Sequence, residues 1–261
     1  MLSMFTLESI LIFAILLGLS LSIGSFVGMA SYRIPRKINL GQTDHPYLLG
    51  GRSQCPQCNR GLRNRDLVPI LSYLLLRGNC FFCNKKISGR YLFIELAACA
   101  CFLICILASN DNLVRLTLFC FMVGLLLLST IDIEHGLLPD QITLPLLWIG
   151  LIVNLYFELV PLSAAVLGAT LGYVTLWLLY WIYKFLRGKE AFGYGDFKLL
   201  AATGAWFGFQ SIPSTLLYAS ITGLIWALLK GFIEKNPIRS VPFGPFISFG
   251  IIIYILSSDS L

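Results

Sequence analysis

Hydrophobic residues in this chain gather in eight long apolar stretches separated by shorter polar segments. Most stretches reach the ~20 residues that an α-helix needs to cross the hydrocarbon core of a bilayer, and the sixth and eighth are short. The pattern predicts an all-α polytopic membrane protein with about eight transmembrane helices and one polar insert after the first helix. The stretches are residues 7–31, 91–109, 113–131, 141–159, 161–183, 199–212, 213–229 and 241–256.

The composition agrees with a protein that is solvated mostly by lipid. Of its 261 residues, 57% are hydrophobic and 12% are charged, and the mean hydropathy is +0.81. A soluble domain has about 25% charged residues, so this chain has too little polar surface for a soluble globule. The first apolar stretch is not expected to be a cleaved signal peptide, because no Lys or Arg precedes it and it exceeds the length of a signal peptide's apolar core.

The basic residues predict an orientation in the membrane. Of the 19 Lys and Arg residues, 11 lie within residues 33–90, four within 184–198 and three within 230–239, leaving only Arg115. Alternating spans place these three segments on one side, which the positive-inside rule makes cytoplasmic. Both termini are then expected outside. Insertion and anionic headgroups explain the net charge of +6, so membrane lipids are expected partners and nucleic acid is not.

The polar insert of residues 32–90 contains two Cys-x-x-Cys pairs, Cys55 with Cys58 and Cys80 with Cys83, separated by 21 residues. Each pair places two thiolates on one turn, and four sulfur ligands in a tetrahedron suit Zn²⁺. Four protein ligands leave no open position, which favours a structural role. The alternatives are disulfides, which a reducing cytoplasm disfavours, or unligated thiols. The other cysteines lie in apolar stretches and are interpreted as packing residues: Cys99, Cys101, Cys105 and Cys120.

Two aspartates adjoin apolar stretches on the predicted cytoplasmic side. Asp132 ends an apolar run, and Asp196 follows Gly193 and Gly195 in a Gly-x-Gly-Asp sequence. A carboxylate beside lipid is costly, which suggests a function. If the two side chains converge, repulsion and burial make them share a proton. One carboxylate can then activate a water while its protonated partner polarises a peptide carbonyl, which is aspartyl proteolysis.

Simpler interpretations of these polar residues stay open. A carboxylate at a membrane edge often caps a helix N-terminus, and Asp140 and Glu134 fit that role best. His135 is more often a partner of backbone or water than a metal ligand. For the whole chain, the alternatives are a proton-coupled transporter, which would carry its carboxylates near the bilayer midplane, and a scaffold or assembly factor without activity.

Taken together, the motifs resemble those of the bacterial type IV prepilin leader peptidases and N-methyltransferases, a family of Gly-x-Gly-Asp aspartyl peptidases. The resemblance covers almost the whole chain, in order. Two departures are Leu92, where the family often has Pro, and Phe192, where it often has Met. The matching segments are Gly24-Ser25-Phe26, Tyr32-Arg33-Ile34-Pro35, Gly51–Cys58, Leu67–Tyr73, Ile87–Tyr91 with Glu95, Ile131-Asp132, Leu138-Pro139-Asp140, Gly193–Leu200 and Val241–Pro245.

The resemblance implies a role for each matching residue. It makes Asp132 and Asp196 the catalytic pair and the four cysteines of the insert the metal ligands. The residues Gly193, Gly195 and Lys198 would line or support the substrate cleft. The domains would be residues 1–31, the first transmembrane helix, 32–90, a cytoplasmic insert associated with methyl transfer, and 91–261, the polytopic peptidase core.

The activity implied is removal of a short basic leader from type IV prepilins or pseudopilins, after Gly, at the cytoplasmic face of the bacterial inner membrane. Many members then methylate the new N-terminal residue with S-adenosylmethionine, and members that lack methylation usually lack the cysteine insert. The insert therefore favours a bifunctional enzyme of a type IV pilus or type II secretion system. Because the chain shows no glycine-rich nucleotide-binding motif, no residue is assigned to S-adenosylmethionine.

Overall fold

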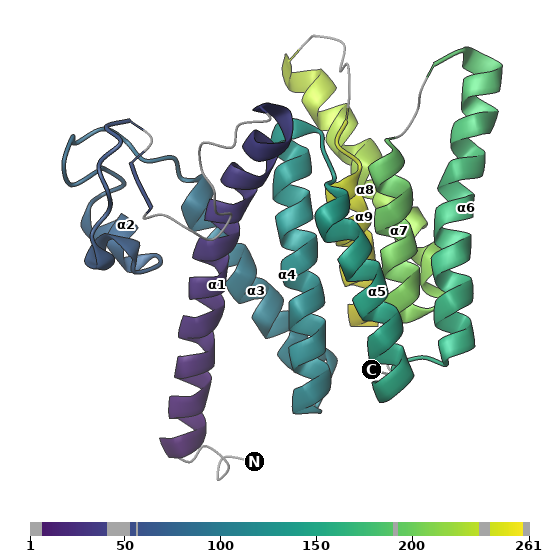
Figure 1. Cartoon of the computed structure of the whole chain (residues 1–261), viewed down its shortest axis with the longest axis horizontal. Helices are drawn as coiled ribbons and strands as arrows, with labels where there is room; N and C mark the ends of the chain where they lie inside the picture. The colour runs from purple at the N-terminus through teal and green to yellow at the C-terminus, as the bar shows by residue number, and fades with distance from the viewer. Residues whose placement is uncertain (1–6, 41–52, 56, 190–192, 235–240, 258–261) are drawn as a thin grey trace. The chain divides into compact units, whose positions relative to one another are not determined.

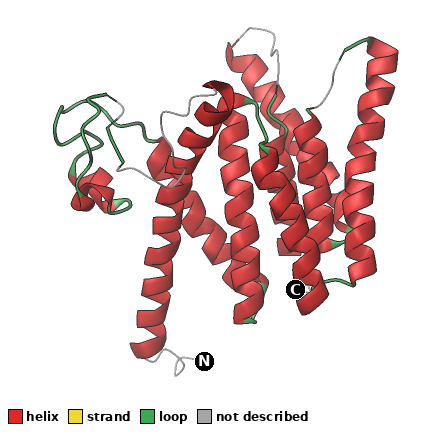
Figure 2. Ribbon diagram, in the orientation of Figure 1, coloured by secondary structure: helices red, strands yellow, loops and turns green. Residues whose placement is uncertain are grey.

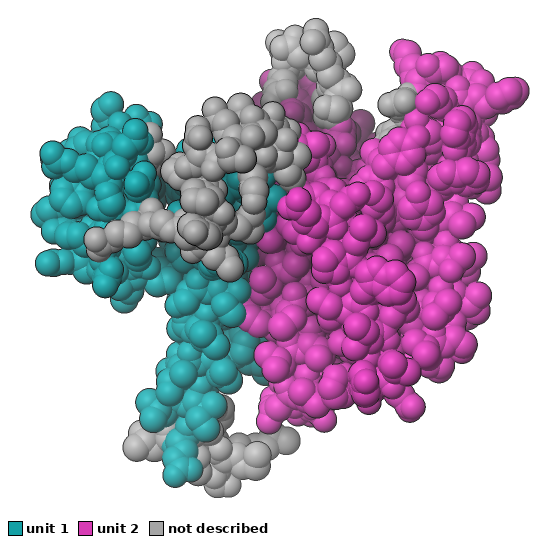
Figure 3. All heavy atoms as spheres, in the orientation of Figure 1, with its two compact units in different colours: residues 1–106 teal, residues 107–261 magenta. Residues whose placement is uncertain are grey.

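The computed structural model describes residues 7–40, 53–55, 57–189, 193–234 and 241–257. The chain forms two compact units, residues 1–106 and residues 107–261 (Figure 3). The described residues are helical with connecting loops and form no strand longer than an isolated bridge (Figure 2). The predicted all-α class is thereby confirmed. Phe192, together with residues 51, 52 and 56 of the matching segment Gly51–Cys58, lies outside the described residues.

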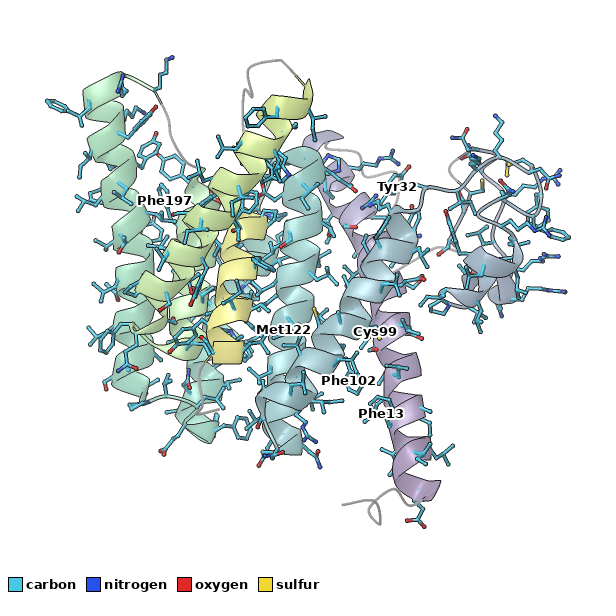
Figure 4. All side chains as sticks on the ribbon, turned by 180° about the vertical axis from the view of Figure 1, so that it is seen from behind. Phe13, Tyr32, Cys99, Phe102, Met122 and Phe197 are labelled. Carbon is cyan, nitrogen blue, oxygen red and sulfur yellow. The ribbon has the colours of Figure 1, made fainter. Side chains whose placement is uncertain are left out.

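The first unit contains α1 (Leu7–Leu40), the short η1 (Asn64–Leu67), α2 (Leu71–Leu75) and α3 (Arg90–Ala108) (Figure 1). Gly24 lets α1 approach α3 closely, since a Cβ there would lie 2.8 Å from the Cα of Glu95. Farther along, the rings of Phe13 and Phe102 lie 6.2 Å apart between the same two helices (Figure 4). The helix α1 continues beyond residue 31, where its apolar stretch was predicted to end, because the basic residues that follow can remain helical.

The second unit contains α4 (Asn112–His135), α5 (Asp140–Phe157), α6 (Leu162–Arg187), α7 (Tyr194–Phe207), α8 (Ser211–Glu234) and α9 (Gly244–Ser257). Its core is α7, which packs against α5, α6 and α9 and is buried along almost its whole length. Small residues permit this packing: a Cβ on Gly172 of α6 would lie 2.6 Å from the carbonyl oxygen of Leu200.

The C-terminal end of α7 is fixed by hydrogen bonds as well as by packing. The side-chain amide of Asn154 donates to the carbonyls of Ala205 and Trp206 at 2.8 and 3.0 Å, and its oxygen accepts from the N–H of Val160 at 2.9 Å. The indole N–H of Trp206 donates to the carbonyl of Leu146 at 2.9 Å. The two bonds from Asn154 satisfy carbonyls of Ala205 and Trp206 at the buried end of α7, where water does not reach them.

Each predicted apolar stretch corresponds to one of the eight longer helices. Six of these, α1, α3, α4, α5, α6 and α8, are long and apolar enough to cross a membrane. The sixth and eighth stretches correspond to α7 and α9, which have 14 residues each. Many large apolar side chains are exposed on the longer helices, as expected where lipid is the solvent. The protein is an integral membrane protein.

Candidate functional site

Asp132 lies in the last turn of α4 and is 6% exposed. The helix ends at Gly136, whose left-handed backbone (φ 62°) lets its N–H donate to the carbonyl of Asp132. The carboxylate oxygen Oδ2 of Asp132 accepts the backbone N–H of Gly244, the first residue of α9, at 2.9 Å. A Cβ on residue 244 would lie 2.8 Å from that same oxygen, so any larger residue there would displace the carboxylate or α9.

Asp196 lies in the first turn of α7 and is 7% exposed. Its carboxylate Oδ2 accepts the backbone N–H of Gly193, the residue that caps the helix, at 3.0 Å. The backbone N–H of Asp196 donates in return to the carbonyl of Gly193 at 3.1 Å. This reciprocal pair begins α7 and holds the carboxylate at the end of the helix whose dipole favours negative charge.

Aromatic contacts anchor this first turn of α7 to α6. The ring of Phe197, the residue after Asp196, lies 5.8 Å from the rings of both Tyr173 and Tyr180 (Figure 4). Tyr194 lies 5.4 Å from Tyr180. These ring contacts hold the first turn of α7, which carries Asp196, against α6.

Leu138, six residues after Asp132 in the segment that follows α4, packs against the beginnings of α7 and α9. A Cβ on Gly195 would lie 2.6 Å from the Cβ of Leu138, and a Cβ on Gly244 would lie 3.2 Å from its Cδ2. The helix α9 also packs against both α4 and α7. Asp132 and Asp196, 64 positions apart in the sequence, are therefore brought into one region of the second unit.

Burial and the proximity of Asp132 change the pKa of Asp196, a residue outside the six described helices that are long enough to span a membrane. Burial, and after it the negative charge of Asp132, raises the pKa of Asp196 to about 7, although the N–H of Gly193 acts in the opposite direction. A carboxyl group in this condition holds a proton near neutral pH. Two buried carboxyls that influence one another suit general acid and base chemistry on a polar substrate bond.

The remaining polar residues predicted near this site form a peripheral layer. Lys198, in the second turn of α7, forms an ion pair with Asp140, the first residue of α5, at 2.6 Å. Nε2 of His135 lies 3.9 Å from a carboxylate oxygen of Glu134.

The two glycines of the Gly-x-Gly-Asp sequence have different surroundings. A Cβ on Gly195 would collide with the side chain of Leu138, whereas a Cβ on Gly193 would meet only Asp196 and the backbone of Gly195 within 4.0 Å.

The four cysteines of the insert come together in the first unit. The Sγ atoms of Cys55, Cys58, Cys80 and Cys83 all lie within 4.8 Å of one another, and those of Cys55 and Cys83 are 4.0 Å apart. Zn–S bonds of about 2.3 Å in a tetrahedron place sulfurs about 3.8 Å apart, so the cluster fits such an ion. These four residues form a site that can hold a metal ion.

The two Cys-x-x-Cys turns have the same backbone geometry. The N–H of Asn59 donates to the carbonyl of Cys55, and the N–H of Asn84 donates to the carbonyl of Cys80, both at 2.9 Å. Both asparagines have left-handed backbones, with φ of 54° and 52°. Asn tolerates this region better than most residues. The Asn after each second cysteine is a signal that the cysteine spacing alone did not reveal.

Two cysteines of this cluster differ in acidity. A backbone donor at Lys85 acts to lower the pKa of Cys83, but burial and the neighbouring thiols raise it to about 11, whereas the pKa of Cys80 shifts the other way. Burial acts to raise the pKa of Cys80, but N–H donors from Cys83 and Phe82, together with the neighbouring thiols, lower it to about 7. A thiolate is the form that ligates a metal. The other cysteines lie in α3 and α4, where Cys101 and Cys105 are buried and Cys120 is exposed in the protein.

Sequence reasoning missed the second layer around Asp132. Gly244 belongs to the motif Val241–Pro245, in which its place between Pro242 and Pro245 is the one local sign of a special backbone. The hydroxyl of Ser248 donates to the carbonyl of Gly244 at 3.0 Å and accepts from the hydroxyl of Ser129 at 2.9 Å. No local pattern distinguishes these serines from others in apolar helices.

Comparisons with known proteins cover nearly the whole chain. Residues 119–228 match the type IV leader peptidase family, and residues 18–109 match the bacterial peptidase A24 N-terminal domain. The prepilin leader peptidase/N-methyltransferase of Dickeya chrysanthemi is 41% identical, covering 94% of both chains. The proteins of the same name from Aeromonas salmonicida strain A449 and Pseudomonas putida are each 39% identical, covering 96% and 93% of this chain and 92% and 90% of theirs.

No solved structure matches this chain. The relatives above are nevertheless 39% to 41% identical to this chain and align along at least 90% of their own length. Proteins this similar over nearly their whole length belong to one family. With the two buried aspartates and the four-cysteine cluster in place, the chain belongs to the type IV leader peptidase family.

Proposed function

We propose that this protein is an aspartyl endopeptidase that removes the short basic leader of type IV prepilins or pseudopilins, after Gly, and methylates the new N-terminal residue. The observation that carries the proposal is the pair Asp132 and Asp196, each buried, each held by a backbone N–H, and joined through Leu138 and α9. The names of relatives that are about 40% identical over most of the chain support it.

The geometry supports a different role for each aspartate, with Asp196 as the acid and Asp132 as the base. Asp196, whose pKa is raised to about 7, carries the shared proton and donates it to the oxygen of the scissile carbonyl. Asp132 accepts a proton from the attacking water, so that the hydroxide adds to the carbonyl carbon. Collapse of the tetrahedral intermediate breaks the C–N bond as the amine takes the proton from Asp132 and a hydroxyl of the intermediate returns its proton to Asp196. The dyad then returns to its starting state.

The supporting residues hold this arrangement. Gly193 and Gly195 begin α7 and leave no side chain where the backbone meets Asp196 and Leu138, and Lys198 fixes α7 to α5 through Asp140. The four-cysteine cluster would hold Zn²⁺ and keep the insert folded, since an insert with few buried apolar residues needs such a crosslink.

The donor for methylation would be S-adenosylmethionine. The described residues contain no strand that leads into a glycine-rich loop and helix, the usual cradle of an adenosyl group, so no residue or step is assigned to it. In the cell, we place the protein in the bacterial inner membrane with its N-terminus in the periplasm and the dyad at the cytoplasmic face. The distribution of Lys and Arg supports this orientation.

The test is cleavage of a prepilin by the full-length protein in liposomes, with mass spectrometry of the product's new N-terminus. Asp132→Asn and Asp196→Asn should each abolish cleavage, whereas the matched control Glu158→Gln, an exposed carboxylate at the opposite end of α5, should retain it. A product with one added methyl group would support the second activity. Full cleavage by either Asn variant would remove that residue from the chemistry.

A further inference from the structure

The short helix α2 in the insert exposes an apolar face. Leu71, Leu74 and Leu75 are 59%, 60% and 82% exposed. Their spacing of three and four residues places them on the same side of the helix. Leu67 and Val68, just before it, are exposed as well. A group of exposed large apolar side chains on a polar segment indicates an interaction site.

Contacts within the first unit fix the position of α2 along the axis of α3. The backbone N–H of Ile70, which caps α2, donates to a carboxylate oxygen of Glu95 at 2.8 Å. The hydroxyl of Tyr73, inside α2, would lie 3.6 Å from a Cβ on Gly89, the residue before α3. Glu95 is the sixth residue of α3, about 8 Å along its axis at 1.5 Å per residue.

This attachment places α2 beside the first two turns of α3, one of the helices long enough to span a membrane. The helix α2 also lies on the lower side of the insert in both Figure 1 and the reversed view of Figure 4. The start of a spanning helix lies where headgroups meet acyl chains. The apolar face of α2 is therefore held at the depth of that boundary.

The charge around α2 indicates the lipid that it meets. From residue 53 to residue 90 the insert carries seven Lys and Arg residues and a single acid, Asp66, which is paired with Arg63 at 3.0 Å. Arg65 and Arg77, both exposed, flank the apolar segment. Basic residues around exposed leucines are the composition of a helix that lies in the surface of an anionic bilayer.

We propose that α2 is an interfacial helix, with Leu71, Leu74 and Leu75 immersed in the acyl-chain boundary of an anionic bilayer and Arg65 and Arg77 at its headgroups. This contact anchors the four-cysteine insert to the membrane at a point other than its two flanking helices. It is independent of the proposed peptidase activity, because it involves no residue of the aspartate pair.

Photocrosslinking tests this directly on the full-length protein. Liposomes of phosphatidylethanolamine and phosphatidylglycerol would contain a trace of lipid with a diazirine in its acyl chain. Trypsin cuts after Arg65 and Arg77, so one peptide, Asp66–Arg77, contains the whole apolar segment. The peptide Tyr91–Arg115, which contains α3, serves as the positive control. We expect both peptides to be labelled, and the first several-fold less when phosphatidylglycerol is omitted.

Matched variants separate the apolar face from added charge. The double change Leu74→Asp and Leu75→Asp should reduce labelling of 66–77 about tenfold, because it removes two apolar side chains from the boundary. Asn64→Asp, exposed in η1, adds a negative charge outside the face and should leave labelling unchanged. Metal content of the cysteine cluster reports whether each variant's insert is folded.

Three results would overturn the proposal. One is a wild-type peptide 66–77 that stays unlabelled while 91–115 is labelled, since another protein surface would then cover α2. Another is labelling that does not depend on phosphatidylglycerol, which would exclude the anionic partner. The third is labelling that appears only when a prepilin is added, which would make the face a substrate contact.

Discussion

Gly244 donates its backbone N–H to Oδ2 of Asp132 at 2.9 Å, across 112 positions of the sequence. The bond joins the end of α4 to the beginning of α9 and occupies one oxygen of the carboxylate. The other oxygen, Oδ1, is therefore the one to which we assign the attacking water. The position of Asp132 thus depends on a residue that carries no side chain of its own.

Replacing Gly244 by Ala should reduce cleavage about 100-fold, since a displacement of about 1 Å at a reacting group can have that effect. The added Cβ would lie 2.8 Å from Oδ2 of Asp132 and 3.2 Å from Leu138, so the carboxylate or α9 must move. The control is Gly231→Ala in α8, where a Cβ meets nothing within 4 Å. Equal turnover numbers for the two variants would contradict this role.

Ser248→Ala should lower kcat several-fold with little change in KM. The variant removes the hydroxyl that donates to the carbonyl of Gly244 and accepts from Ser129, which loosens the segment that holds Asp132. The loss of stability should be about 1 kcal/mol. Ser248→Thr, which keeps the hydroxyl, should restore turnover. Ser257→Ala, at the exposed end of α9, is the control. A change in KM alone would point to substrate binding instead.

The rate of cleavage should fall as the pH rises above about 7. The pKa of Asp196 is raised from 3.8 to about 7 in the folded protein, so folding favours its protonated form. Its contribution to stability is complete below pH 3.8 and is lost as the pH rises through about 7. The proton that the proposed mechanism needs is lost over the same range. A kcat profile in liposomes checks this, and a rate that stays constant to about pH 9 would refute the assignment.

The purified protein should contain one Zn²⁺ per chain, measured by elemental analysis. Cys55→Ser and Cys80→Ser should each lose most of the metal, because three remaining sulfurs bind it less tightly. Cys99→Ser, in α3, should retain it. Since the cluster and the aspartate pair lie in different compact units, cluster variants should lose methylation while retaining more of their cleavage. Stoichiometric metal in both cluster variants would show that other residues bind it.

The fold was predictable from local pattern to a large extent. Apolar stretches of defined length indicate helices without reference to distant residues, and all eight are helical in the structure. The two short stretches could not be placed by that reasoning, because a stretch of about 14 residues suits a buried helix as well as a membrane segment. The tertiary structure places them: α7 packs among α5, α6 and α9, and α9 packs against α4, α7 and α8.

Composition and short-range spacing were enough to predict the helical membrane class, the four-cysteine cluster and the two candidate aspartates, because each depends on residues close together in the chain. Other relationships are visible only in the folded protein: Gly244 holds Asp132, Leu138 packs against the beginnings of α7 and α9, and α2 exposes its leucines. These relationships arise from packing between distant segments, and no local period or spacing encodes them.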